Sequence, residues 1–79
     1  MTIQQLEYLI AVDKYRHFGN AAESCFVTQP TLSAQLSKLE KELGVILFDR
    51  SKMPVIPTEI GVQIIAQAKK VVSESKGIM

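Results

Sequence analysis

The chain has 79 residues and a formal net charge of +1, and 47% of its residues are hydrophobic. This length and composition fit one small globular domain and exclude a disordered chain. One cysteine and one histidine exclude an internal disulfide and a cysteine-based zinc site, and they leave no nucleophile–base pair for catalysis. We therefore expect neither an enzyme nor a metal or cofactor, and any nucleic-acid role must depend on where the cations lie.

The N-terminal segment, MTIQQLEYLIAVDKY, does not have the pattern of a signal peptide or of a membrane span. No basic region precedes an apolar run, and Glu7 and Asp13 interrupt the apolar residues. The rest of the chain contains no internal repeat and no low-complexity segment. We therefore expect a cytoplasmic protein without a membrane partner.

Two helices are predicted in the first third of the chain. The first covers residues 3–15, because Thr2 and Gln5 can form a capping box at its start. The second is short and covers residues 18–25, and its small alanines allow another helix to approach closely. A turn at residues 26–27 follows and leads into the next helix.

The third predicted helix covers residues 29–43. Thr28 can cap it, Pro30 occupies the first turn where its missing N–H has no cost, and Gly44 can end it. Four leucines at helical spacing form the stripe that we expect to be buried. These are Leu32, Leu36, Leu39 and Leu43.

The last third of the chain is expected to form a β-hairpin and a long helix. Residues 45–48 and 55–56 read as strands, with a turn at residues 51–54 between them. Thr58 can cap a helix over residues 59–76. The result is a mainly α fold, a winged helix-turn-helix with a three-helix core and a two-stranded β wing.

The outer face of the predicted 29–43 helix is populated by small residues and lysines. Carboxylates are absent from it, because Glu40 and Glu42 lie nearer the leucine stripe. Such a face can enter the major groove of DNA, where Gln29 can pair with adenine and Ala34 or the Pro30 ring can contact a thymine methyl. Lys38 and Lys41 can bind phosphates. The alternative is a merely solvated helix face. The predicted DNA-binding residues on this helix are Thr28, Gln29, Pro30, Thr31, Ser33, Ala34, Ser37 and Lys38.

The last helix, part of a linker over residues 58–79, has its own apolar seam. Small residues recur every seven positions, and aliphatic residues flank them as far as Met79. Small residues allow close helix approach, so we predict that this helix pairs with a second copy of itself. The alternative is that the seam packs on the rest of the chain, residues 1–57. The predicted dimerisation residues are Gly61, Ile64, Ile65, Ala68, Val71, Val72 and Ser75.

Two stretches carry a family resemblance. The segments AAESCFVTQPTLSAQLSKLEKELGVILFDR and TEIG resemble the N-terminal DNA-binding domain of LysR-type transcriptional regulators, and the match extends along nearly the whole chain. Within that family, LEYLIAVDKYRHFGNAAESC together with QPTLS most resembles the peroxide-sensing members. The resemblance implies a longer regulator whose C-terminal effector domain is absent from this chain.

The resemblance also implies how such a domain binds DNA. Arg50 and the wing, with Lys52 as its other cation, would reach the DNA backbone or the minor groove. The linker helix would form a homodimer that binds pseudo-palindromic half-sites, and the full-length protein would be a homotetramer. The chain departs from the family at the wing tip, where Met53 and Pro54 replace a usual second arginine, and in the turn, where Phe26 stands.

The favoured function is therefore sequence-specific binding of double-stranded DNA by a bacterial transcription regulator of the peroxide response, associated with the nucleoid when bound. The competing interpretation is a winged-helix module for protein–protein interaction, which the near-neutral net charge supports. The carboxylate-free outer face and the wing cations favour DNA. A salt series on random duplex DNA separates the two, because phosphate contacts give a steep salt dependence.

Overall fold

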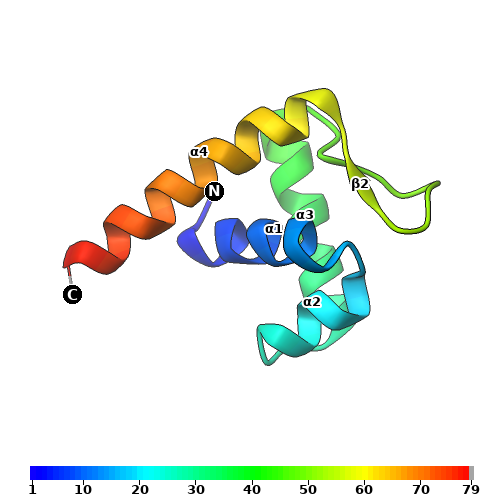
Figure 1. Ribbon diagram of the computed structural model, residues 1–79, viewed down its shortest axis with the longest axis horizontal. Coiled ribbons are helices and arrows are strands. Elements are labelled where there is room, and N and C mark those ends of the chain that lie inside the picture. Colours follow the sequence, from blue (N-terminus) through cyan, green and yellow to red (C-terminus); the bar gives the residue numbers. More distant parts are fainter. Residues whose placement is uncertain (79) are drawn as a thin grey trace.

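The computed structural model describes residues 1–78 and contains, within them, four helices and one two-stranded antiparallel sheet (Figure 1). This confirms the predicted winged helix-turn-helix, with β1 and β2 forming the base of the wing. The elements in chain order are α1 (Ile3–Tyr15), α2 (Phe18–Ser24), α3 (Gln29–Leu43), β1 (Phe48–Asp49), β2 (Ile56–Pro57) and α4 (Glu59–Ile78).

The first helix, α1, is fixed by its own cap and tied to α3. The Thr2 hydroxyl accepts from the Gln5 amide, and the Gln5 carboxamide oxygen accepts from the Thr2 amide, both at 3.0 Å. This is the predicted capping box. The Gln5 side chain then donates to Gln35 of α3 at 3.0 Å, so the polar cap of one helix also positions the next.

The helix-turn-helix is formed by α2 and α3. His17 caps α2, because its Nδ1 accepts from the Asn20 amide at 2.9 Å. Helix α2 ends at Ser24, one residue before the predicted boundary, and Cys25 after it is half-buried. The turn passes through Phe26, which adopts a left-handed φ of 60° and is 95% exposed.

The hydrophobic core lies where α1, α2, α3 and α4 meet, and three of the four predicted stripe leucines belong to it. Leu43 does not, because it lies in the last turn of α3 and remains 37% exposed. Gly44 ends α3 with a φ of 70°, as predicted. The completely buried side chains are Leu9, Val12, Ala21, Leu32, Leu36, Leu39 and Leu47.

The first strand, β1, is shorter than predicted, and both strands lie further along the chain than predicted. Phe48 pairs with Pro57 and Asp49 with Ile56. The amide of Leu47 is held by the Glu40 carboxylate at 2.6 Å instead of by a strand. On the other side of the hairpin, the amide of Val55 likewise bonds outside the sheet, because it donates to the Arg16 carbonyl at 3.1 Å. The expected strand residues 45–47 and 55 therefore bond to helix ends.

The last helix, α4, begins in close contact with the segment before β1. The Thr58 hydroxyl accepts from the Gly61 amide at 3.0 Å, which confirms the predicted cap, and donates to the Ile46 carbonyl at 2.6 Å. A Cβ atom on Gly61 would lie 2.1 Å from the Leu47 carbonyl oxygen, so only glycine fits there. Thr58 and Gly61 thus hold the start of α4 directly against the backbone of Ile46 and Leu47.

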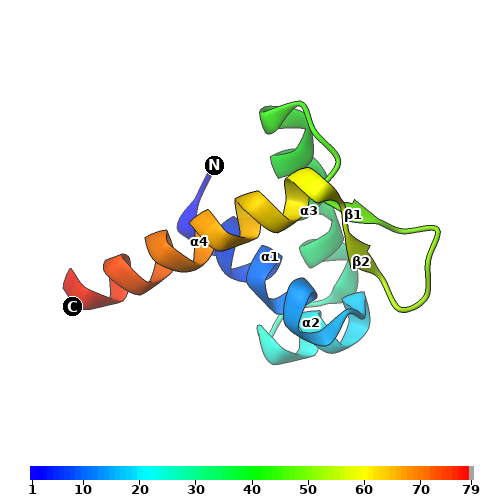
Figure 2. The ribbon, with the colours of Figure 1, turned by 45° about the horizontal axis from the view of Figure 1, so that its top comes forward.

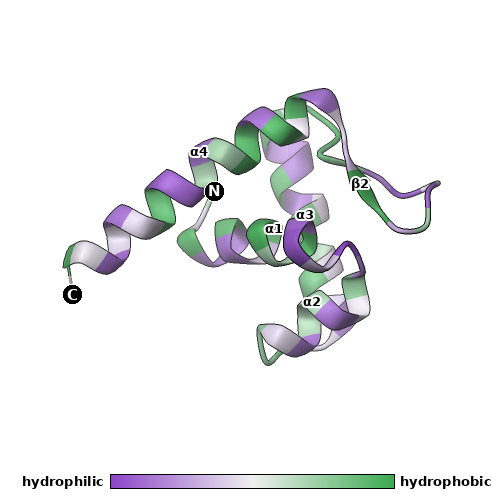
Figure 3. Cartoon of the chain, in the orientation of Figure 1, coloured by the Kyte–Doolittle hydropathy of each residue, from purple (hydrophilic) through white to green (hydrophobic). Residues whose placement is uncertain are grey.

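Further along, α4 packs on α1. The C-terminal end of α4 and the wing project from opposite sides of the body, which is the part of the chain formed by residues 1–57 without the wing tip (Figure 1, Figure 2). Apolar residues follow α4 along much of its length (Figure 3). No helix within residues 1–78 combines the length and apolar character needed to cross a membrane.

Four of the seven residues predicted for the dimer seam are buried within the chain itself. Those four line the contact between α4 and the body, where Ile65, Ala68 and Val72 are 4%, 2% and 8% exposed. The body is long enough to cover this face because α4 lies along α1 instead of extending away from it. Met79, at the end of the predicted seam, lies outside the described residues. The buried four are Gly61, Ile65, Ala68 and Val72.

Candidate nucleic-acid interface

The outer face of α3 is open to solvent, as the sequence predicted. Its carboxylates lie elsewhere: Glu40 is buried on the leucine side, and Glu42 bonds to the N-terminal ammonium of Met1. Ser33 is half-buried at the edge of this face. The exposed members are Thr28, Gln29, Pro30, Thr31, Ala34, Ser37, Lys38 and Lys41.

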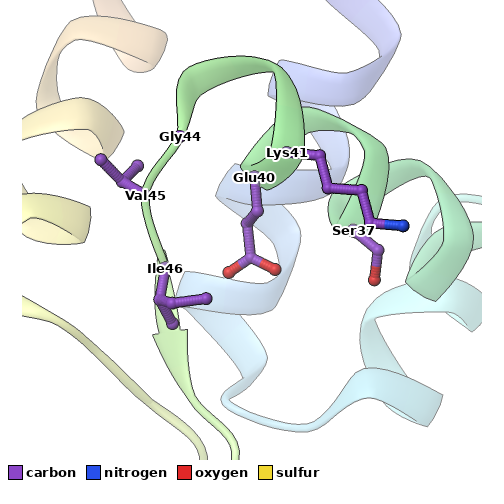
Figure 4. Close-up of a pocket in the computed structure, with 6 residues that line it drawn as sticks. All are labelled: Ser37, Glu40, Lys41, Gly44, Val45 and Ile46. Atoms are coloured by element: carbon purple, nitrogen blue, oxygen red, sulfur yellow. The ribbon is translucent and has the colours of Figure 1, made fainter.

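A hollow of about 360 Å³ lies beside the end of α3, and Ser37 and Lys41, from the C-terminal half of the outer face, are among the residues that line it. Figure 4 shows the Glu40 carboxylate lying between the helix and the chain at Ile46, whereas Ser37 and Lys41 extend on the other side of α3. The buried carboxylate and the outward lysine thus occupy different sides of one helix. This separation keeps the outer face free of negative charge.

The first turn of α3 presents two connected hydroxyl groups. The Thr28 oxygen accepts from the Thr31 amide at 3.3 Å, and its hydroxyl donates to the Thr31 hydroxyl oxygen at 2.9 Å. The Thr31 hydroxyl hydrogen is therefore free to donate to a ligand. Pro30 beside them has no N–H that DNA binding would leave unpaired.

A cleft of about 410 Å³ separates α3 from the wing, which is residues 48–57. Gln29 and Ser33 line it from α3, His17 from the start of α2, and Met53 from the wing. Gln29 also lies next to Gly19, where an added Cβ would be 3.5 Å from its carboxamide oxygen. Gln29 is thus placed on the wing side of α3 and not at the centre of the outer face.

Arg50 has a partner inside the chain that the sequence reasoning missed. Its Nη2 and Nη1 bond to the two carboxylate oxygens of Glu40 at 2.9 and 3.2 Å, and Nη1 also donates to the Phe48 carbonyl at 3.4 Å. The guanidinium lies 5.2 Å from the centre of the Phe18 ring. The position of Glu40 beside the leucine stripe was the sequence signal for this ion pair, because a buried carboxylate requires a cation or hydrogen bonds. Arg50 therefore links α3 to the wing, and its DNA contact stays a prediction.

The remaining charges of the wing are those of Asp49, the last residue of β1, and of Lys52 in the turn that follows. Asp49 accepts from the Ser51 hydroxyl at 2.5 Å and from the Ser51 amide at 3.0 Å. The hydroxyl bond, then the amide bond, hold the pKa of Asp49 below its ordinary value, and the charge of Lys52 acts in the same direction. Lys52 itself is exposed, as is Met53 at 79%.

The predicted DNA-binding residues thus form two groups. The α3 group surrounds the outer face and the cleft, and Lys38 and Lys41 form no ion pair with any residue in the described part of the chain. In the wing group, Arg50 lines the cleft opposite Gln29 and Ser33, and Lys52 is exposed in the turn of the wing. Among residues 1–78, the acidic, cysteine and histidine side chains form no cluster that could hold a metal ion.

Comparison with known sequences agrees with this geometry. Residues 3–62 match the family described as "Bacterial regulatory helix-turn-helix protein, lysR family". The chain is 50% identical over 76 residues to the hydrogen peroxide-inducible genes activator of Haemophilus influenzae and, equally, to the DNA-binding transcriptional dual regulator OxyR of Escherichia coli. Each alignment covers 96% of this chain and 25% of the relative, so the chain spans about a quarter of these proteins.

Solved structures give the same result for the fold. Full-length OxyR from Pseudomonas aeruginosa superposes with a TM-score of 0.95 at 50% identity, covering 99% of this chain and 26% of that protein. The BenM DBD in complex with catB site 1 DNA also gives 0.95, at 35% identity, covering 99% and 84%. The match along residues 3–62 and these superpositions show that the chain belongs to the lysR family of bacterial regulatory helix-turn-helix proteins.

Proposed function

We propose that this chain is the double-stranded DNA-binding domain of a longer bacterial transcription regulator. The observation that carries the proposal is the outer face of α3, which is exposed, small and free of carboxylates, with Lys38 and Lys41 unpaired among the described residues. A helix with such a face can approach the base edges without steric or electrostatic repulsion. The relatives named as regulators, and the BenM DBD complex with DNA, support the same function.

The residues of this face divide by chemistry. Gln29 can bond to an adenine edge, and Ala34 and the Pro30 ring can contact thymine methyl groups. The lysines, Lys38 and Lys41, supply phosphate contacts that position the helix without reading sequence. Arginine is absent from α3, so guanine readout through a bidentate guanidinium is not available to it.

We propose that two copies pair through α4, by a face that keeps Ile64 and Val71 of the predicted seam and leaves out its buried residues. Beside the buried face, apolar residues continue along a second side of α4, where Ile60, Val71 and Ile78 are 39%, 44% and 88% exposed and Ile64 is half-buried. Their spacing is that of a helix–helix seam. A symmetric dimer presents two copies of α3, which fits pseudo-palindromic half-sites, and the full-length protein would pair further into a homotetramer.

We assign the regulator to the peroxide response, acting in the bacterial cytoplasm and on the nucleoid when bound. The support is the 50% identity to relatives named for hydrogen peroxide. Cys25 is half-buried at the end of α2, where its role is that of a small packing residue. The sensing step therefore belongs to other parts of the longer protein.

Selection of duplexes from a random pool tests DNA binding by the chain. We expect enrichment of one motif, and Gln29→Ala should relax the preference at one base pair of it. Lys38→Ala should weaken binding to all duplexes and flatten the slope of log K against log salt by about 0.9. Lys70→Ala is the matched control, since Lys70 is an exposed lysine of α4. An unenriched pool and a binding constant indifferent to salt would favour the protein-interaction module instead.

A further inference from the structure

The backbone of Arg16 joins the end of α1 to the wing. Arg16 follows the last residue of α1 and has a left-handed φ of 54°, a conformation in which glycine is usual at a helix end. Its amide donates to the Val12 carbonyl at 2.8 Å, and its carbonyl accepts from the Val55 amide at 3.1 Å. Val55 is buried and lines the cleft between α3 and the wing. The conformation of Arg16 therefore sets where the wing side of the cleft lies.

The side chain of Arg16 is bonded to the last turn of α1. Its Nε donates to the Asp13 carbonyl at 2.6 Å, and its Nη2 donates to Oδ1 of the Asp13 carboxylate at 3.0 Å. Two bonds to one residue fix the guanidinium and so support the left-handed backbone, which is otherwise unfavourable for a residue with a Cβ. One acceptor is backbone, but the other is a side chain. The conformation of Arg16 thus depends on where the Asp13 carboxylate lies.

The same carboxylate also contacts α4. Its second oxygen, Oδ2, lies 3.7 Å from Nζ of Lys69, and the Asp13 side chain is 19% exposed. The Lys69 side chain is 58% exposed, so this ion pair contributes little to stability by itself. Its importance is positional, because one carboxylate is shared between α4 and Arg16. A shift of Lys69 with α4 therefore changes the support of Arg16 and, through it, the bond to Val55.

We propose that Asp13 is a positioning residue that couples the placement of α4 to the wing side of the cleft, through Arg16 and Val55. The proposal rests on the DNA-binding function proposed above, since Gln29 lines the opposite side of that cleft. Among residues 1–78, the lining of the cleft includes neither Asp13 nor Arg16, so both act on it from behind. The DNA interface thereby responds to movement of α4, the helix through which two copies pair in the proposed dimer.

Amide hydrogen exchange of the free chain tests the coupling without DNA. Relative to the core amide of Leu36, the Val55 amide should exchange about tenfold faster in Asp13→Ala and about threefold faster in Lys69→Met. The double variant should equal Asp13→Ala alone, because Lys69 acts only through Asp13. Lys70→Met, an exposed lysine of the same helix, is the matched control and should exchange like wild type. An unchanged Val55 amide in either single variant, or additive effects in the double variant, would overturn the coupling.

Duplex affinity tests the consequence for binding. Asp13→Ala removes a negative charge, which by electrostatics alone would strengthen binding to phosphates. A positioning role predicts the opposite, a loss of about tenfold on the best duplex selected by the wild-type chain, because the cleft loses its support. Glu7→Ala, which removes an exposed carboxylate from the same helix, is the matched control and should bind at least as well as wild type.

The two measurements separate the ways in which the proposal can fail. Equal or tighter duplex binding by Asp13→Ala would overturn the positioning role, even with a loosened Val55 amide. A wild-type chain that selects no duplex would overturn the DNA-binding function and, with it, the role of Asp13 at the interface. The exchange measurements need no DNA, so they show in that case whether Asp13 still couples α4 to the wing.

Discussion

The outer face of α3 and the apolar seam of α4 were both predicted to be interfaces, and folding treats them in opposite ways. The α3 face remains in solvent, with Ala34 and Lys38 exposed. The centre of the α4 seam, by contrast, is covered by the chain itself, and Ala68 is only 2% exposed. A polar face of small residues gains nothing from burial, so folding leaves it free. An apolar stripe is stabilised by any apolar neighbour, and its own body is the nearest one.

The largest expected effect comes from the same substitution at these two alanines. Ala68→Glu should destabilise the fold by about 3–5 kcal/mol, because it places an unpaired carboxylate in the core. Ala34→Glu should change the free energy of unfolding by less than about 0.5 kcal/mol, since that position is exposed. It should nevertheless abolish duplex binding through repulsion of phosphates. Urea unfolding of both variants measures the contrast, and equal stabilities would contradict the assignment of the α4 face.

A second pair of substitutions tests how α4 docks. Gly61→Ala should destabilise the fold by about 3 kcal/mol, because its Cβ would lie 2.1 Å from the Leu47 carbonyl oxygen. Gly77→Ala in the same helix has no atom within 4 Å of the new Cβ, and it should be neutral or stabilise by up to about 1 kcal/mol. Thermal unfolding decides between them. Similar midpoints for the two variants would mean that α4 does not begin against Leu47.

The third pair addresses the revised dimer face. Val71→Glu should leave the fold intact, because Val71 is 44% exposed, but should yield a monomer. Loss of the second DNA-binding domain of the dimer should lower affinity for a duplex with two half-sites about a hundredfold. Val62→Glu, on the other exposed side of α4, is the matched control and should remain dimeric. Sedimentation velocity provides the measurement, and a dimer that survives in the Val71 variant but not in the Val62 variant would move the seam to that other side.

Features that depend on neighbouring residues could be predicted from the sequence. The bounds of α1 and α3 agree with the prediction because Thr2, Thr28, Pro30 and Gly44 act within one helical turn of their own helix ends. The carboxylate-free face of α3 followed from the same helical periodicity. Motif spacing identified the family, which the match along residues 3–62 confirms.

Features that depend on distant residues could not be predicted in this way. The Glu40 carboxylate takes both the Leu47 amide and the Arg50 guanidinium, and this single contact shortens a strand and compensates a wing cation. Its partners are seven and ten residues away, beyond the reach of helical periodicity. Sequence alone showed that Glu40 lies near the leucines but not what would bond to it.

By itself the sequence determined where the helices begin, where α1 and α3 end, which face of α3 is left for a partner, and which family the chain belongs to. Only the tertiary structure decided where the strands pair, what Arg50 binds, and which side of α4 is free. The physical reason is the range of the interactions. Caps and periodicity act within a turn, whereas burial of the α4 stripe depends on α1, which precedes it by more than forty residues in the chain.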